Sequence, residues 1–171
     1  RVVQSPLVFG SRGITIRHVL YVPRRGVAVE LAPDAVAAMA ATRAHVEALA
    51  ASDRPAYGVS TGFGGLATTA IPPDRRDRAQ RALIASHAAG LGDPVEPEVV
   101  RAMIVLRART LATGITGARP ELAAALLALL DRDPLPEVPE FGSLGCSGDL
   151  APLAHVAAAL DLPLEAKEGL A

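Results

Sequence analysis

Hydrophobic residues in the middle of the chain recur at spacings of three and four positions, which is the period of an α-helix with one buried face. The clearest case begins at Pro97, and Arg101 and Arg109 fall on its other side. Its apolar positions are Val100, Met103, Ile104, Ala108 and Leu111. The pattern predicts a helix that begins at Pro97.

Prolines mark the starts of four further expected helices, because the first helical turn tolerates a residue without an N–H group. Alanine, the best helix former, is frequent in these segments. The helix that starts at Pro72-Pro73 is expected to end near Gly90, a residue type that often follows a last helical turn. The expected ranges are 33–51, 72–90, 120–130 and 149–160.

The opening segment has a different pattern. Two short apolar stretches, 14–22 and 27–31, are separated by the basic turn Pro23-Arg24-Arg25-Gly26. We expect a helix or strand first and then a strand. Glycine and proline break the pattern again at 52–65 and 133–148, which predicts loops. The chain is therefore expected to form one mainly α domain over residues 1–171, with long loops and at most a short strand pair.

Composition narrows the function. Half of the 171 residues are hydrophobic and the formal net charge is −1, so no global field attracts nucleic acid or an anionic membrane. Every apolar run is interrupted well before the roughly 18 residues that span a bilayer. The single cysteine, Cys146, allows no internal disulfide, and no secretory leader pattern opens the chain. A soluble, cytoplasmic protein is expected, without a nucleic-acid or membrane partner and without a metal.

The stretch from Gly142 to Asp149 is the most informative loop. It lacks the lysine of a phosphate-binding loop, and no strand precedes it as a hydrolase nucleophile elbow would require. A thiol nucleophile remains open, with Cys146 served by His87 or His155 as base. The simplest interpretation is a tight turn that feeds a helix, with Asp149 as its cap and Cys146 packed as a small hydrophobe.

The same loop, extended to Ala154 as GSLGCSGDLAPLA, resembles the signature of the ammonia-lyases and aminomutases that use a methylideneimidazolone group. The resemblance implies that Cys146, Ser147 and Gly148 cyclise to form this group, so no external cofactor is needed. Ser147 would lose its hydroxyl to give the methylidene, and Gly148 would supply the attacking nitrogen. Cys146 stands where the family usually has Ala, and it would contribute only its carbonyl carbon and Cα.

A second match lies upstream. Residues 57–64, YGVSTGFG, resemble the family loop Tyr-Gly-x-x-Thr-Gly-Phe-Gly, which implies that Tyr57 is the catalytic base. A phenol has a pKa of about 10, so this role requires surroundings that lower it. The plain alternative is a loop tyrosine with a packed ring and a hydrated hydroxyl.

A third match, Ser86-His87-Ala88-Ala89-Gly90, is similar to the helix segment that separates substrate classes in this family. A Ser-His pair there is typical of the histidine-directed members. The resemblance implies a substrate-binding set of His87, Ser86, Gly64 and Leu150. An imidazole can donate at one nitrogen and accept at the other, as a substrate imidazole does. The alternative for His87 is a histidine that caps helix-end carbonyls.

The resemblance implies non-oxidative elimination of ammonia from L-histidine to give urocanate, in a homotetramer with active sites shared between subunits. A phenylalanine- or tyrosine-directed lyase or aminomutase, and a non-catalytic remnant or interaction domain, stay open. Family members continue into a central helical bundle and a C-terminal region that these 171 residues lack. Negligible turnover is therefore expected from the chain alone. His18, His45 and His155 receive no role.

Overall fold

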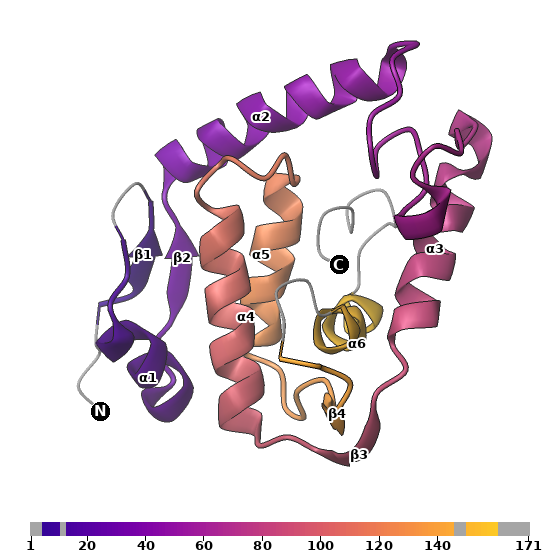
Figure 1. Cartoon of the computed structure of the whole chain (residues 1–171). Coiled ribbons are helices and arrows are strands. Elements are labelled where there is room, and N and C mark those ends of the chain that lie inside the picture. The colour runs from indigo at the N-terminus through magenta and orange to yellow at the C-terminus, as the bar shows by residue number, and fades with distance from the viewer. Residues whose placement is uncertain (1–4, 11–12, 146–149, 161–171) are drawn as a thin grey trace.

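The computed structural model describes residues 5–10, 13–145 and 150–160. Within these ranges the chain forms six α-helices, four short strands and two 3-10 turns (Figure 1). The helices are α1 (Ile16–Arg25), α2 (Pro33–Ala51), α3 (Arg76–His87), α4 (Pro97–Leu111), α5 (Pro120–Leu129) and α6 (Ala151–Ala159). The strands are β1 (Leu7–Phe9), β2 (Val29–Leu31), β3 (Leu91–Pro94) and β4 (Pro139–Phe141). The 3-10 turns are η1 (Gly64–Leu66) and η2 (Pro73–Arg75).

The expected mainly α fold is confirmed, but the described residues contain two strand pairs instead of one. β1 pairs in parallel with β2, and β3 pairs antiparallel with β4. Strands of three or four residues are too short for an alternating pattern to identify them. In β3 every residue is exposed and Leu91 is its one large hydrophobic residue, so no buried face marks this strand in the sequence.

Two boundaries differ from the expectation. The prediction of a basic turn at 23–26 is wrong, because Pro23, Arg24 and Arg25 form the last turn of α1. The helix ends at Gly26, whose φ of 61° lets its amide donate to the Val22 carbonyl. Helix α3 stops at His87 and not near Gly90, since Ala88 already leaves the helical region with ψ of 56°.

The core lies where α4 packs between α1 and α5, while α3 packs against α6 on the other side (Figure 1). The most deeply buried side chains, with no more than 1% exposure, come mainly from the helix faces that the sequence period predicts. In α4 and α5 they are Ile104, Val105, Ala108, Leu111, Leu122, Ala123, Leu126 and Leu129. Burying one such leucine stabilises the fold by roughly 1.5–3 kcal/mol. This core holds the helices that carry the motifs.

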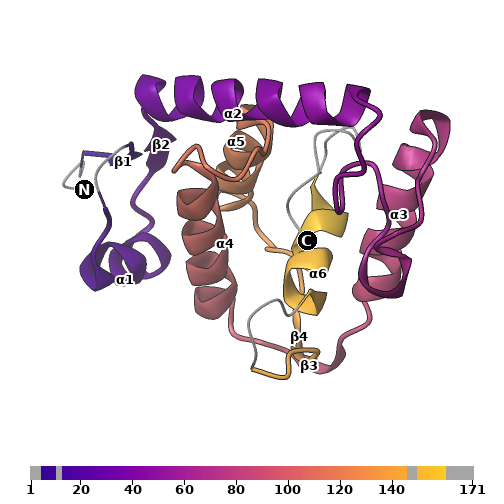
Figure 2. The ribbon, with the colours of Figure 1, turned by 45° about the horizontal axis from the view of Figure 1, so that its top comes forward.

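Helix α2 runs across one end of the molecule, along the top of the view in Figure 2, over α4, α5 and α6, and it ends beside α3. The Thr42 hydroxyl donates to the Gly114 carbonyl, which ties α2 to the turn between α4 and α5. The same turn comes so close that a Cβ on Gly114 would lie 2.5 Å from the Ala38 Cβ. The C-terminal end of α2 leads directly into the Tyr57 loop. In the described part of the chain, no helix has both the length and the apolar character needed to cross a membrane.

Candidate active site

The loop after α2 is shaped by its own hydroxyl groups. The Ser60 hydroxyl accepts a hydrogen bond from the Ala56 amide at 2.9 Å, and the Thr61 hydroxyl accepts one from the Gly58 amide at 3.3 Å. Thr61 is only 3% exposed. Gly58 has a φ of 70°, and a Cβ there would lie 2.8 Å from a ring carbon of Phe63. The loop therefore needs glycine at 58 to bring Phe63 beside Tyr57.

Tyr57 is 64% exposed, yet its orientation is fixed at both ends of the side chain. Its ring meets the Phe63 ring edge to face, with 5.9 Å between the centroids and 83° between the planes. Its phenolic oxygen accepts a hydrogen bond from the Gly64 amide at 3.3 Å. The hydroxyl hydrogen is not used in this bond. Tyr57 and Gly64, two of the predicted site residues, are thus in direct contact.

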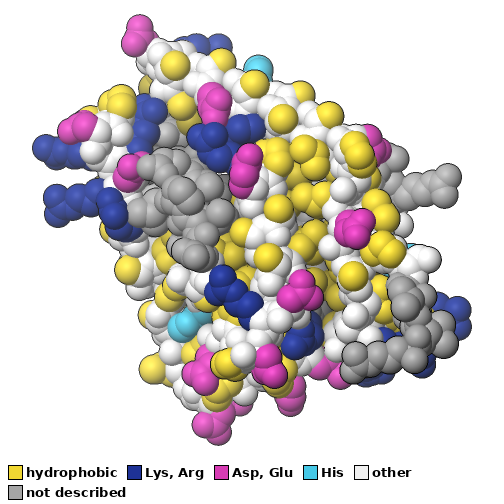
Figure 3. All heavy atoms as spheres, turned by 180° about the vertical axis from the view of Figure 1, so that it is seen from behind, with side chains coloured by type: hydrophobic (Ala, Val, Ile, Leu, Met, Phe, Trp, Pro, Cys, Tyr) yellow, Lys and Arg dark blue, Asp and Glu magenta, His cyan; other side chains and the backbone are white. Residues whose placement is uncertain are grey.

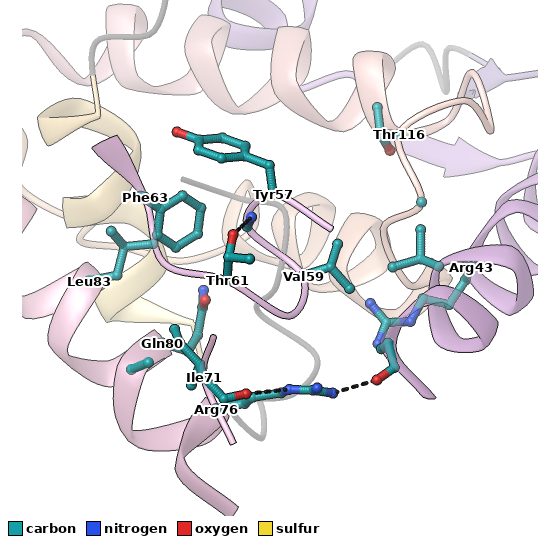
Figure 4. Close-up of a pocket in the computed structure, with 15 residues that line it drawn as sticks. Arg43, Tyr57, Val59, Thr61, Phe63, Ile71, Arg76, Gln80, Leu83 and Thr116 are labelled. Carbon is teal, nitrogen blue, oxygen red and sulfur yellow. Dashed lines mark hydrogen bonds between the residues drawn. The ribbon is translucent and has the colours of Figure 1, made fainter. Parts of the chain in front are cut away.

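A pocket of about 350 Å³ lies beside this loop (Figure 4). Tyr57, Thr61 and Phe63 line it from the loop, and Gln80 and Leu83 line it from α3. In the close-up the two aromatic rings lie together, apart from the guanidinium groups of Arg43 and Arg76. The pocket offers a partly apolar space with polar groups at its edge, which suits a small molecule with both kinds of surface.

Arg76, which lines the pocket, connects two of the segments around it. Its guanidinium donates to the Ala50 carbonyl at 3.0 Å and to the Ile71 carbonyl at 3.4 Å (Figure 4). The end of α2 and the segment before α3 are thereby fixed to each other. Arg76 acts here on the backbone, and it is a residue that the motif analysis did not single out.

Ser86 and His87 occupy the last turn of α3, one turn beyond the pocket residue Leu83. The Leu83 carbonyl accepts hydrogen bonds from the Ser86 hydroxyl at 3.0 Å and from His87 Nδ1 at 2.8 Å. A carbonyl only accepts, so Nδ1 carries the hydrogen, and Nε2 of a neutral ring is then an acceptor. Within the described residues no hydrogen bond involves Nε2. The interpretation of His87 as a cap of helix-end carbonyls therefore accounts for Nδ1 and leaves Nε2 able to accept a hydrogen bond.

Cys146, Ser147, Gly148 and Asp149 lie outside the described residues, but the residues around them are described. Leu150 is the N-cap of α6. A Cβ on Gly142 would lie 3.1 Å from the Ala151 Cβ, so the chain before this segment closely approaches the chain after it. A five-membered ring formed from residues 146–148 requires a sharply folded backbone. The flanking geometry and the residue types at 146–148 fit that requirement.

His155 makes a contact that was not expected from the sequence. Its Nε2 accepts a hydrogen bond from the Gly90 amide at 3.1 Å, which joins α6 to the segment just after Ser86-His87. No local pattern signals this contact, because the two residues are 65 positions apart. His18 has a local role, since its Nδ1 accepts from the Thr15 amide at the start of α1. The described residues hold no cluster of three His, Cys, Asp or Glu side chains suited to a metal.

Comparison with known proteins identifies the family. Residues 14–161 match the family described as aromatic amino acid lyase. The chain belongs to this family. The match includes all three motifs and the helices α2 to α6 that position them.

Individual relatives of this aromatic amino acid lyase chain show how much of the family it represents. A histidine ammonia-lyase of Streptomyces coelicolor is 54% identical over 154 residues, which are 90% of this chain and 30% of that protein. The chain thus spans about 30% of the length of the curated relatives it matches.

Solved structures of lyase relatives share the fold. A histidine ammonia-lyase from Trypanosoma cruzi matches with a TM-score of 0.77 and 32% identity, over 89% of this chain and 28% of that one. A tyrosine aminomutase from Streptomyces globisporus matches with a TM-score of 0.82 and 32% identity, over the same shares of the two chains, 89% and 28%. Two proteins named for different substrates therefore resemble this chain in backbone to a similar degree. The fold leaves the choice of substrate to the side chains.

Proposed function

We propose that this chain is the N-terminal part of a histidine ammonia-lyase, which eliminates ammonia from L-histidine without oxidation to give urocanate. The observation that carries the proposal is the hydrogen bonding of His87. Nδ1 is held by the Leu83 carbonyl, so Nε2 of the neutral ring is left as an acceptor. An imidazole N–H of the substrate is a donor of matching size and polarity. The relatives with about half of their matched residues identical carry the same name.

We assign the prosthetic group to Cys146, Ser147 and Gly148, which would supply an electrophile able to engage the substrate. Tyr57 then serves as the proton acceptor at the substrate β-carbon. Its ring is fixed by Phe63 and its oxygen by the Gly64 amide, so the acceptor atom is held in one orientation on a residue that lines the pocket. Gly64 acts on Tyr57 through its amide, while direct substrate contacts of Gly64, Ser86 and Leu150 remain predictions.

We further propose that the protein works as a homo-oligomer in the cytoplasm, a tetramer by analogy with its family. Large hydrophobic side chains are strongly exposed in this chain, among them Ile115 at 80% and Leu144 at 93%. On the rear face, hydrophobic side chains gather below the side chains of α2 (Figure 3). Such areas favour association. Sedimentation velocity at increasing concentration tests this, and a profile that stays monomeric contradicts it.

Intact mass tests the prosthetic group. Cyclisation removes two waters, so the purified chain should be about 36 Da lighter than its sequence mass, and peptide mapping should place the deficit at 146–148. Ser147→Ala is the control, because alanine has no hydroxyl to lose. An unmodified parent mass means that this chain alone does not form the group.

Turnover is tested in a chimera, because the relatives extend far beyond the matched region. The 154 matched residues replace their counterparts in the Streptomyces coelicolor enzyme. We expect conversion of L-histidine to urocanate in preference to any reaction of L-tyrosine or L-phenylalanine. A preference for tyrosine or phenylalanine would overturn the substrate assignment, and formation of a β-amino acid would indicate an aminomutase. The Ser147→Ala chimera should be inactive.

A further inference from the structure

The segment from Gly90 to Pro94 contacts the chain on both sides of residues 146–149. On the upstream side, β3 pairs with β4, and Leu91 lies opposite Phe141. The pairing is extended by a hydrogen bond from the Val95 amide to the Val138 carbonyl at 2.9 Å. The strand that leads into the cyclising segment is therefore fixed to the segment that follows Ser86-His87.

On the downstream side, the link is His155. It lies one turn into α6, is partly buried, and accepts the Gly90 amide hydrogen at its Nε2. The ring packs close to this backbone, since a Cβ on Gly90 would lie 3.1 Å from Nε2. The bond requires an imidazole whose Nε2 carries no hydrogen. One short segment thus holds the residues before and after 146–149.

The two sides also meet each other. A Cβ on Gly142 would lie 3.1 Å from the Ala151 Cβ and 3.4 Å from the Gly90 Cα. Three stretches of backbone that are distant in sequence converge here, and only small residues allow the approach. Fixing both ends of a segment close together lowers the entropy that the segment loses when it closes on itself.

We propose that His155 is a positioning residue for formation of the prosthetic group. This rests on the proposed function. In ring formation the Gly148 nitrogen bonds to the Cys146 carbonyl carbon. The Cys146 oxygen leaves as water with the amide hydrogens of Gly148 and Ser147, and the Ser147 hydroxyl leaves as water with its Cα hydrogen. By holding α6 against Gly90, His155 keeps the downstream end of the segment close to the end fixed by β4. The same bond sets the ring-bearing segment relative to His87.

The test compares His155→Leu, His155→Gln and the matched control His45→Leu, because His45 is exposed on α2. Glutamine places a side-chain oxygen near the position of Nε2 and so retains an acceptor. The measurements are the rate at which the two-water mass deficit appears, the hydrogen exchange of the Gly90 amide, and the melting temperature. We expect His155→Leu to slow ring formation at least about tenfold and to expose the Gly90 amide, because loss of alignment lowers effective concentration. His155→Gln should restore both, and His45→Leu should change neither.

The outcomes separate this proposal from the proposed function. The positioning role is overturned if His155→Leu forms the ring as fast as the parent, or if His155→Gln fails to recover while all variants melt together. A parent chain without the mass deficit means that this chain alone does not form the group, and the variants are then compared in the chimera with the Streptomyces coelicolor enzyme. There the same criteria apply: slower ring formation in His155→Leu alone supports the positioning role, and equal rates in all variants overturn it, whereas a chimera that forms the ring but does not convert L-histidine counts against the proposed function only.

Discussion

The amide nitrogen of Gly64 lies 3.3 Å from the phenolic oxygen of Tyr57 and donates a hydrogen bond to it. This contact joins the first and last residues of the motif, and the Phe63 ring packs against Tyr57 between them. The loop is thus folded around the oxygen that we propose as the proton acceptor. Tyr57 as a whole is 64% exposed, so the residue contributes little to the core.

Tyr57→Phe separates chemistry from folding. Phenylalanine keeps the edge-to-face contact with Phe63 and loses only the acceptor oxygen. We expect the chimera to lose activity by a factor of about 10² to 10⁴, the range for removal of a general base. The melting temperature should be nearly unchanged. The matched control is Tyr21→Phe, the only other tyrosine of the chain, which lies on α1 under the Arg25 guanidinium. If the Tyr57→Phe chimera is as active as the Tyr21→Phe control, the assignment of Tyr57 as the base is contradicted.

His87→Leu tests substrate selection. It removes the Nε2 acceptor together with the Nδ1 bond to the Leu83 carbonyl. We expect kcat/KM of the chimera for L-histidine to fall roughly 10- to 100-fold, the cost of one hydrogen bond to a polar or charged partner. Any residual activity toward L-tyrosine should fall less. Equal losses for both substrates would show that His87 serves the helix end alone, and His45→Leu controls for the general effect of the substitution.

The sequence predicts the helices better than it predicts what joins them. Prolines at 33, 97 and 120 mark true helix starts because the first turn needs no N–H from them. Pro23 is misleading, because the preceding residues already form a helix that continues through it. β3 and β4 escape prediction, since their pairing depends on tertiary contacts and not on a hydrophobic pattern.

In the candidate site, too, local features are predictable from the sequence and tertiary contacts are not. Motif resemblance selects Tyr57, Ser86 and His87, and local chemistry accounts for the hydroxyl bonds within their loops and helix ends. The contact between His155 and Gly90 has no local signal, because it is created only when α6 packs on α3. Likewise, nothing near Arg76 in the sequence indicates that its guanidinium binds the Ala50 carbonyl at the end of another helix.

Gly114→Ala should destabilise the chain substantially. Gly114 has a φ of 73°, and an added Cβ would lie 2.5 Å from the Ala38 Cβ on α2. The left-handed backbone costs an L-residue about 1–2 kcal/mol, and forced overpacking costs about 1–3 kcal/mol more. We expect the free energy of unfolding to fall by about 2–5 kcal/mol in denaturant titrations.

The matched control for this prediction is Gly65→Ala. Gly65 is exposed, and a Cβ there would meet no atom within 4 Å. Its effect should stay within about 0.5 kcal/mol. Ala38→Gly in the Gly114→Ala background removes the closest clash, so it should recover part of the loss. No recovery would mean that backbone strain alone explains the effect.

Glu47 links α2 to the start of α5. It accepts a hydrogen bond from Arg43 at 3.0 Å and pairs with Arg119 at 2.8 Å. The hydrogen bond from Arg43, aided by the charge of Arg119, holds the pKa of the Glu47 carboxyl below its usual range. A carboxyl with a lowered folded-state pKa stabilises the fold above its unfolded pKa of about 4.3, and this contribution is lost as the pH falls through the folded pKa.

Glu47→Gln should therefore lower the melting temperature at pH 7, and the difference from the parent should shrink as the pH falls below about 4.3. Added salt at pH 7 should also reduce this difference, because the Glu47 and Arg119 side chains are accessible to solvent and charges are screened over about 8 Å at physiological ionic strength. Glu137→Gln, at an exposed position, controls for the loss of one negative charge. A difference at position 47 that persists unchanged at pH 3 would show that the side chain acts through packing and not through its charge.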